Sequence, residues 1–160
     1  MERLQQYDVV VVGGGTAGVS AAVGAAKTGA KTLLIERNAY LGGEATNSGV
    51  SAFCGFYTCG ENPVRVVEGV GRLVLNEMEA LGPTVDYVIS ATGNRNINFQ
   101  PEYLKCAMDN LLEKERVDYL LHTSVIGADT ENGTITAIHC VDDEGTFTVA
   151  AKAFVLMASV

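Results

Sequence analysis

The stretch Tyr7–Glu36 decides the fold; it reads Y-D-V-V-V-V-G-G-G-T-A-G-V-S-A-A-V-G-A-A-K-T-G-A-K-T-L-L-I-E. Its run of four valines predicts a parallel strand buried on both faces. A G-x-G-x-x-G pattern follows at once over 13–18, and a helix rich in small residues is expected up to about Thr28, with Gly29 as its stop. A second strand is expected at 31–35. Together these elements predict a βαβ unit that opens the domain.

The three glycines of the pattern have distinct roles in a dinucleotide-binding turn. We expect Gly13 to permit the tight turn, Gly15 to let the backbone approach a pyrophosphate, and Gly18 to let the helix pack on the sheet. Free N–H groups at the start of the helix would then hold the phosphates. A turn with a purely structural role would explain the glycines as well.

Glu36 ends the second strand and lies eighteen residues after Gly18 (36 − 18). At this position a carboxylate can accept hydrogen bonds from both hydroxyls of an adenosine ribose, and it would repel a 2′-phosphate. A structural turn does not explain an acid at the end of an apolar strand. The spacing therefore predicts an adenine-dinucleotide site that rejects NADP, with Glu36 at a strand end and outside the core.

Composition and charge exclude several classes of protein. The chain has 160 residues, about the length of one domain, and its 48 % hydrophobic and 19 % charged residues are typical of a globular protein. Its net charge of −8 argues against binding to nucleic acid or to an anionic membrane. We see no signal peptide and no run approaching the ~20 apolar residues of a membrane span, so a cytoplasmic location is expected.

The four cysteines lack the spacing of metal ligands, and the chain has only two histidines, so no metal site is expected. Cys54 and Cys59 are separated by four residues, which leaves two interpretations: a redox pair, or two unconnected thiols. We favour unconnected thiols in a reducing compartment, because no basic residue nearby would lower the pKa of either thiol.

A second glycine-rich segment, R-N-A-Y-L-G-G-E-A-T, follows directly over 37–46. With the first glycine turn it resembles the FAD-dependent oxidoreductases of the glutathione-reductase-like superfamily, especially a bacterial group that reads roughly L-L-V-E-R-x-x-x-L-G-G-x-A-T. Disulfide reductases of that superfamily carry two cysteines where this chain has Ala45 and Val50. The resemblance therefore excludes a flavin disulfide reductase of that kind.

The remaining chain predicts alternating helices and strands. Asn132-Gly133 is a strong hairpin signal, and Asn94-Arg95-Asn96 offers a loop that could face a substrate or partner, although a solvated loop is the preferred interpretation. The expected elements are helices at 66–81 and from Pro101, a short strand at 85–90, a polar loop at 91–98, a parallel strand at 117–122, a β-meander at about 125–150 and a returning strand at 153–158. The fold expected over 1–160 is a single α/β domain, a Rossmann-like parallel sheet with helices on both faces and an inserted three-stranded β-meander.

The resemblance implies FAD as the cofactor and covers only the N-terminal, FAD-binding portion of such enzymes. The usual C-terminal substrate domain is expected to be absent, and we expect a homo-oligomer or a partner chain to cover the last strand. We nominate no catalytic residue. The cofactor-binding residues implied by the motifs and the resemblance are Gly13, Gly14, Gly15, Thr16, Ala17, Gly18, Glu36, Arg37, Gly42, Gly43, Glu44, Ala45, Thr46, Val125 and Ala158.

Two functions remain open from the sequence. The first is the FAD-binding domain of a flavin-dependent oxidoreductase, an enzyme if the chain is complete or is complemented by a partner. The second is a non-catalytic, truncated or split flavoprotein module that binds an adenine dinucleotide weakly and acts through oligomeric assembly. A NAD-dependent dehydrogenase domain is disfavoured by the Gly42-Gly43 pair and by the expected meander.

Overall fold

A computed structural model describes residues 5–82 and 85–157 of the chain. These residues form two compact units, which we call the six-stranded unit (Met1–Leu41 with Leu112–Val160) and the three-stranded unit (Gly42–Leu111) after their sheets. The expectation of a single domain over 1–160 stays a prediction. Within the described ranges, no helix is both long enough and apolar enough to cross a membrane.

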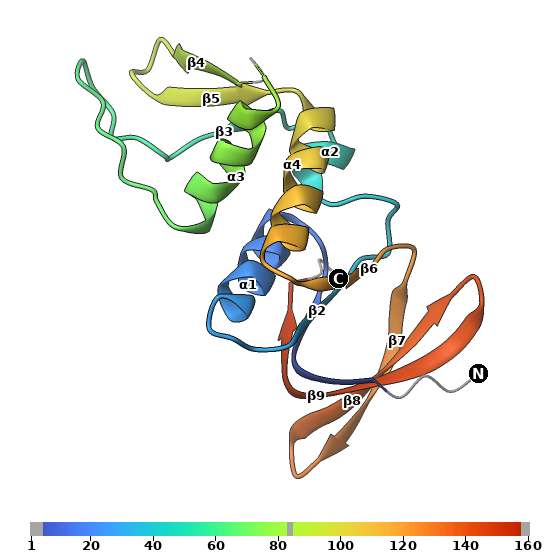
Figure 1. The fold of residues 1–160 in the computed structure, drawn as a ribbon. Helices are drawn as coiled ribbons and strands as arrows, with labels where there is room; N and C mark the ends of the chain where they lie inside the picture. The colour runs from blue at the N-terminus through green and yellow to red at the C-terminus, as the bar shows by residue number, and fades with distance from the viewer. Residues whose placement is uncertain (1–4, 83–84, 158–160) are drawn as a thin grey trace. The chain divides into compact units, whose positions relative to one another are not determined.

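The six-stranded unit contains the predicted βαβ element. Its sheet has the order β6-β2-β1-β9-β8-β7, in which β1 is parallel to β2 and β9, and β2 is parallel to β6. Helix α1 contacts β1, β2 and β9. The expected Rossmann-like α/β fold is thereby confirmed (Figure 1). The elements of this unit are β1 (Gln5–Val12), α1 (Thr16–Ala26), β2 (Thr32–Ile35), β6 (Asp118–Leu120), β7 (Ser124–Glu131), β8 (Thr134–Asp142) and β9 (Gly145–Leu156).

The meander consists of β7, β8 and the first half of β9, each antiparallel to the next. The turn between β7 and β8 places Asn132 and Gly133 at φ 49° and 79°, the left-handed conformations for which the Asn-Gly pair is selected. In the next turn, Oδ1 of Asp142 accepts hydrogen bonds from the N–H groups of Glu144 and Gly145 at 2.9 and 3.1 Å. Local turn chemistry therefore produces both hairpins.

Strand β9 differs from the expectation of two separate strands. It is one strand of 12 residues that pairs with β8 from Gly145 to Ala150 and with β1 from Val149 to Leu156. Between 146 and 156 there is neither a glycine nor a proline to end it. The meander is thus continuous with the parallel sheet. The predicted end of the returning strand, Ala158, lies outside the described residues.

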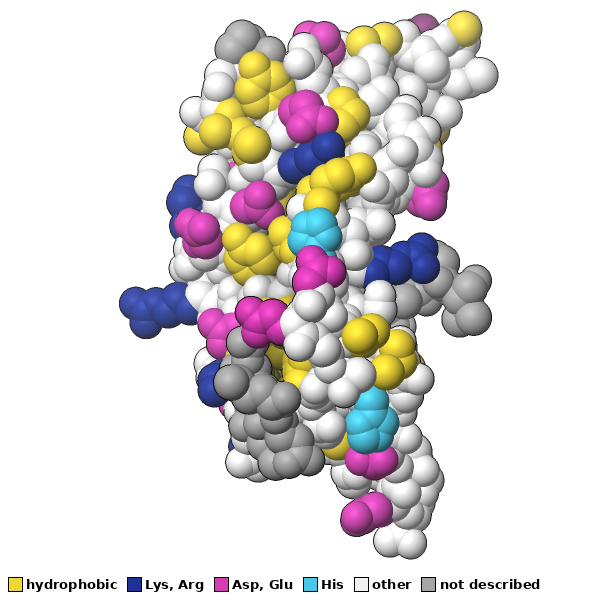
Figure 2. Space-filling view, turned by 90° about the vertical axis from the view of Figure 1, so that its right-hand side faces the viewer, with side chains coloured by type: hydrophobic (Ala, Val, Ile, Leu, Met, Phe, Trp, Pro, Cys, Tyr) yellow, Lys and Arg dark blue, Asp and Glu magenta, His cyan; other side chains and the backbone are white. Residues whose placement is uncertain are grey.

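The core of the six-stranded unit joins the parallel strands to the meander. Both faces of β1 and β2 are buried, as the run of valines predicts. The buried residues of this core cluster are Tyr7, Val10, Leu33, Ile35, Ile138, Cys140, Phe147 and Val149. Apolar side chains are also exposed, among them Leu156 and Met157 at the end of β9, and in the face shown in Figure 2 apolar side chains alternate with acidic and basic ones.

The three-stranded unit has an antiparallel sheet of order β3-β5-β4. The prediction of a polar loop over 91–98 is wrong, because β5 occupies much of it. Ile97 and Phe99 alternate with polar residues along β5, and they are 0 % and 6 % exposed, so their burial holds the strand in the sheet. The strands are β3 (Ala52–Phe53), β4 (Val85–Ile89) and β5 (Arg95–Phe99), and the helices that begin in this unit are α2 (Glu44–Asn47), α3 (Val70–Ala80) and α4 (Pro101–Lys114).

Helix α3 is shorter than the predicted 66–81. Gly69 precedes it at φ 66°, which breaks the helical conformation at this residue. The residues before Gly69 do not continue the helix, and the N–H of Val66 donates to the carbonyl of the distant Phe56 at 2.8 Å. Helix α4, in contrast, begins at Pro101 as predicted, where the missing proline N–H costs no hydrogen bond.

Candidate functional site

The first glycine turn connects β1 to α1 and has the expected steric features. Gly13 has φ 104°, and its N–H donates to the carbonyl of Ile35 on the neighbouring strand at 2.8 Å. A Cβ atom at Gly18 would overlap the carbonyl oxygen of Gly13. The first and third glycines therefore allow the turn and the close approach of the helix, as the sequence predicts.

The start of α1 offers backbone N–H groups without a competing side chain. Gly15 is the N-cap residue and has no side-chain oxygen with which to cap the helix. Thr16 and Ala17, the first two helical residues, are exposed. First-turn N–H groups have no partner inside a helix, and the helix dipole adds partial positive charge there, so an anion is the partner that this end would accept.

The carboxylate of Glu36 is buried and highly coordinated. Glu36 is 6 % exposed, so the expectation that it lies outside the core is wrong. Its Oε2 accepts the N–H of Gly14 at 2.6 Å, and its Oε1 accepts the N–H and the Nδ2 of Asn38 at 2.8 and 2.7 Å. A carboxylate accepts about four hydrogen bonds. The fold itself therefore supplies three of them and leaves about one for a ligand.

Gly14, the middle glycine, has a structural role that the sequence reasoning missed. Its N–H is the donor to Glu36, and a Cβ atom here would lie 2.6 Å from Cδ2 of Leu41 and 3.0 Å from Oε2 of Glu36. Any side chain would force the turn away from the acid. The available signal for this contact was that the x position of G-x-G, residue 14, is itself a glycine.

Asn38 is the second residue that the sequence reasoning missed. In addition to its two bonds to Glu36, its carbonyl accepts the N–H of His122 at 3.1 Å, and the carbonyl of Glu36 accepts the N–H of Thr123 at 3.0 Å. An Asn two residues after a strand-end acid was a usable signal, because Asn side chains bond to nearby backbone and turn groups. These contacts fasten the turn after β2 to the segment that leads into β7.

Val125 and Arg37 flank this arrangement. Val125 is the second residue of β7, two positions after Thr123; it is half-buried and pairs with Cys140. Arg37 directly follows Glu36, and its side chain is exposed. The six-stranded unit thus brings the glycine turn, Glu36, Arg37 and the start of β7 into one region.

The second glycine segment lies in the three-stranded unit. Gly42 and Gly43 have φ 109° and 55°, and a Cβ atom at Gly42 would overlap Cγ2 of Thr46. The N–H and the hydroxyl of Thr46 donate to the carbonyl of Gly43 at 3.1 and 3.3 Å. Ala45 and Thr46 are buried, and Glu44 is exposed. The glycine pair therefore forms a tight turn into α2.

The cysteine pair is also in the three-stranded unit. Cys54 and Cys59 are free and exposed, and the thiol of Cys59 donates a hydrogen bond to Oδ1 of Asn94 at 2.8 Å. No disulfide joins these two thiols in the structure, and the choice between a redox pair and unconnected thiols stays a prediction.

Comparison with known proteins assigns the family. A profile described as FAD dependent oxidoreductase matches residues 8–155. Digeranylgeranylglycerophospholipid reductase of Thermoplasma acidophilum is 38 % identical over 76 residues, which are 48 % of this chain and 14 % of that protein. The enzyme of the same name from Methanospirillum hungatei is 30 % identical over 125 residues, 78 % of this chain and 26 % of that protein.

A solved structure has the same fold at low sequence identity. The geranylgeranyl bacteriochlorophyll reductase-like protein of Thermoplasma acidophilum superposes with a TM-score of 0.65 and 22 % identity over 96 % of this chain and 39 % of that one. The matched regions are thus only 14 % and 26 % of the two curated relatives. Because the family profile covers nearly all of this sequence, the chain belongs to the FAD dependent oxidoreductases, and this membership supports FAD as its cofactor.

Proposed function

We propose that this chain is the FAD-binding domain of a flavin-dependent oxidoreductase and holds the ADP part of FAD at the glycine-rich turn and Glu36. The observation that carries the proposal is the buried Glu36 carboxylate, which is fixed by Gly14 and Asn38 beside the turn. A purely structural role would explain the buried Glu36 carboxylate, but it would not explain why the neighbouring start of α1 has no side-chain cap. Bound flavin would supply hydride transfer, while this chain binds and orients the cofactor.

The pyrophosphate would bind to N–H groups at the start of α1. Gly15 leaves the first turn of this helix without a side-chain cap, and Thr16 and Ala17 are exposed. Phosphate oxygens there would satisfy donors that have no intrahelical partner. The glycines of the turn fit this role because they leave no side chain between the backbone and the ligand.

The ribose would bind to the remaining acceptor site of Glu36. Because three of about four sites are filled, one hydroxyl can bind directly. Binding of the second hydroxyl requires that Asn38 release one of its two bonds to Oε1. A 2′-phosphate would meet a buried carboxylate, so the site should select against it.

The other residues of the proposed site are those that the sequence resemblance implies. Arg37, which is exposed, would approach a phosphate, and the backbone of Val125 would contact the adenine. The residues Gly42, Gly43, Glu44, Ala45 and Thr46 form the second loop, and Ala158 completes the proposed set.

The test compares Glu36→Gln with a matched charge change, Glu131→Gln, at the exposed end of β7. The wild type should retain flavin absorbance near ~375 and ~450 nm after incubation with FAD and desalting. Glu36→Gln should weaken ADP binding in calorimetry at least ~10-fold, which is about 1.4 kcal/mol. Glu131→Gln should bind like the wild type. Equal ADP affinity of folded Glu36→Gln and wild-type protein would refute the placement.

A second candidate function is favoured by the exposed apolar end of β9. Leu156 and Met157 are 61 % and 40 % exposed. Exposed apolar side chains of this size can mediate association. A non-catalytic module that acts through assembly would sediment as an oligomer and lose FAD on desalting, whereas the oxidoreductase domain would retain FAD.

A further inference from the structure

The guanidinium of Arg95 lies against two tyrosine rings in the three-stranded unit. Its central carbon is 5.0 Å from the ring centroid of Tyr57 and 5.4 Å from that of Tyr87. The two rings meet edge to face, with centroids 6.2 Å apart and planes at 90°. Arg95 begins β5, Tyr87 is in β4, and Tyr57 precedes α3, so three separate segments build this arrangement, which we call the Arg95 cluster.

The charge of Arg95 has no anionic partner among the described residues. Its Nε is buried and has no hydrogen-bond acceptor, and within residues 5–82 and 85–157 Arg95 forms no ion pair. Glu79, the acid at the cluster, accepts the hydroxyl of Tyr87 at 2.8 Å and lies 3.9 Å from Arg72. Arg95 therefore has two aromatic rings as partners and no described anion.

Tyr87 does not supply the missing negative charge. Burial, followed by the hydrogen bond and the charge of Glu79, raises the pKa of Tyr87 to about 12. The side chain remains a neutral phenol at physiological pH. Its ring attracts the guanidinium through the π face, which is a weaker partner than a carboxylate.

The position of Arg95 makes this lack of an acceptor costly. The sheet pairs Arg95 with Ile89 and Ile97 with Tyr87, so Arg95 projects from the same face as buried Ile97. A buried donor without an acceptor costs free energy. Arg95 as a whole is half-buried, and its two Nη groups, which are not among the buried atoms without a partner, are the donors open to a ligand. The hydroxyl of Tyr57 has no protein hydrogen-bond partner in the described part of the chain, and it is not among the buried atoms there, so it is open to solvent or to a ligand.

We propose that the Arg95 cluster binds a carboxylate attached to an apolar or aromatic body. The planar guanidinium matches a carboxylate and can bind it through two parallel hydrogen bonds. The hydroxyl of Tyr57 supplies a further donor, and the two rings provide apolar contact for the body of the ligand. The inference does not depend on the FAD site, because Arg95, Tyr57 and Tyr87 are not among the residues proposed to hold FAD.

The test is a titration of ¹⁵N-labelled protein with benzoate, followed by amide chemical shifts. Saturable shifts should map to β4, β5 and the segment around Tyr57. Arg95→Gln should weaken benzoate binding at least ~10-fold. Arg95→Lys keeps the positive charge but loses the planar guanidinium that forms two parallel hydrogen bonds, so it should weaken binding by roughly 3-fold. Arg116→Gln should have no effect, because exposed Arg116 lies in the six-stranded unit.

Two further ligands separate carboxylate recognition from other binding. Benzamide has the same ring without the charge and should cause no saturable shift at the cluster, and inorganic phosphate should bind more weakly than benzoate. The proposal is overturned if benzoate gives no saturable shifts, if benzamide matches it, or if folded Arg95→Gln binds as wild type does. If Arg95→Gln does not fold, unchanged binding by Arg95→Lys overturns it. A repeat with saturating ADP should leave benzoate affinity unchanged.

Discussion

The glycine turn of the six-stranded unit and the Arg95 cluster of the three-stranded unit both hold a charged side chain against the protein interior. They differ in how many hydrogen bonds the protein provides to the charged group. Glu36 accepts three hydrogen bonds from its own fold, whereas Arg95 has a buried Nε without an acceptor. A charge that is satisfied internally fixes local structure. A charge that is left unsatisfied is available to a ligand. We therefore expect changes of the turn glycines to act mainly on folding and changes of Arg95 mainly on binding, whereas Glu36, with about one acceptor site left, serves both the fold and the proposed ribose site.

The largest difference is expected between two helical glycines. Gly18→Ala should destabilise the protein by about 3 kcal/mol, because the new Cβ overlaps the backbone oxygen of Gly13 and α1 must move. Gly71→Ala in α3 meets atoms of the Phe56 ring at 3.0 and 3.2 Å, and a ring can rotate away, so its effect should stay within about 1 kcal/mol. Urea unfolding of each variant measures the difference.

Gly24→Ala is the control for the first substitution. Gly24 lies in the same helix as Gly18, and within the described structure a Cβ there has no neighbour within 4 Å. Alanine should stabilise α1 by about 0.5–1 kcal/mol through its helix propensity. Equal effects of the alanines at 18 and 24 would contradict the tight packing of the turn.

The fold of the six-stranded unit could be predicted because its signals are local. The valines of β1, the glycines of the turn and Asn132-Gly133 each determine the conformation of their own neighbourhood. The three-stranded sheet could not be predicted in this way. Strand β5 carries polar residues at every second position, and its identity as a strand depends on non-local burial of Ile97 and Phe99.

In the candidate site, too, local features could be predicted from the sequence and non-local contacts could not. The roles of Gly13 and Gly18 follow from backbone geometry that the motif implies, but burial of Glu36 depends on Gly14, Asn38 and the distant segment at Thr123. In the Arg95 cluster, the loop Asn94-Arg95-Asn96 drew attention from sequence alone. The two tyrosine partners of Arg95 come from other segments, and no local sequence pattern links those segments to Arg95.

Two tyrosines allow a smaller comparison of the same kind. The hydroxyl of Tyr7 donates to Asp118 at 3.0 Å in the six-stranded unit, and that of Tyr87 donates to Glu79 at 2.8 Å in the three-stranded unit. Tyr7 is 4 % exposed and Tyr87 is 37 % exposed. Tyr7→Phe should cost about 1 kcal/mol of unfolding free energy, and Tyr87→Phe at most about 0.5, because water can replace the bond of the exposed hydroxyl. Similar losses would remove this contrast between the units.

The pH dependence of the unfolding free energy gives a second measure of the contribution of Tyr7. Burial and Asp118 raise its pKa to about 12, whereas an unfolded tyrosine ionises near pH ~10. Between these values the unfolded chain loses the proton first, so stability should fall as pH rises from ~10 to ~12, by up to about 1.4 kcal/mol per pH unit. Burial raises the pKa of Cys140 to about 11 and acts in the same direction. The Tyr7 contribution is therefore the difference between wild type and Tyr7→Phe in denaturant midpoints measured from pH 9 to 12.

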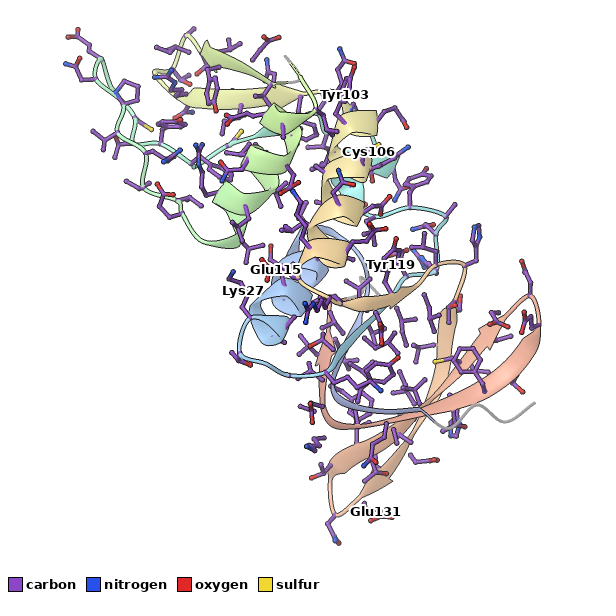
Figure 3. The ribbon with its side chains drawn as sticks, viewed as in Figure 1. Lys27, Tyr103, Cys106, Glu115, Tyr119 and Glu131 are labelled. Atoms are coloured by element: carbon purple, nitrogen blue, oxygen red, sulfur yellow. The ribbon has the colours of Figure 1, made fainter. Side chains whose placement is uncertain are left out.

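The smallest effects are expected from surface ion pairs, where the two units should not differ. Lys27, after α1, and Glu115, after α4, are 3.3 Å apart (Figure 3), and Arg65 and Glu68 in the three-stranded unit are 2.7 Å apart. Both pairs are partly exposed, so water and salt screen them, and double-mutant cycles should give at most about 0.5 kcal/mol for each. A coupling well above 1 kcal/mol for Lys27 and Glu115 that persists in 1 M salt would contradict this expectation. It would mean that the six-stranded unit fixes its surface charges as firmly as it fixes Glu36, and that the contrast between the units extends beyond their buried groups.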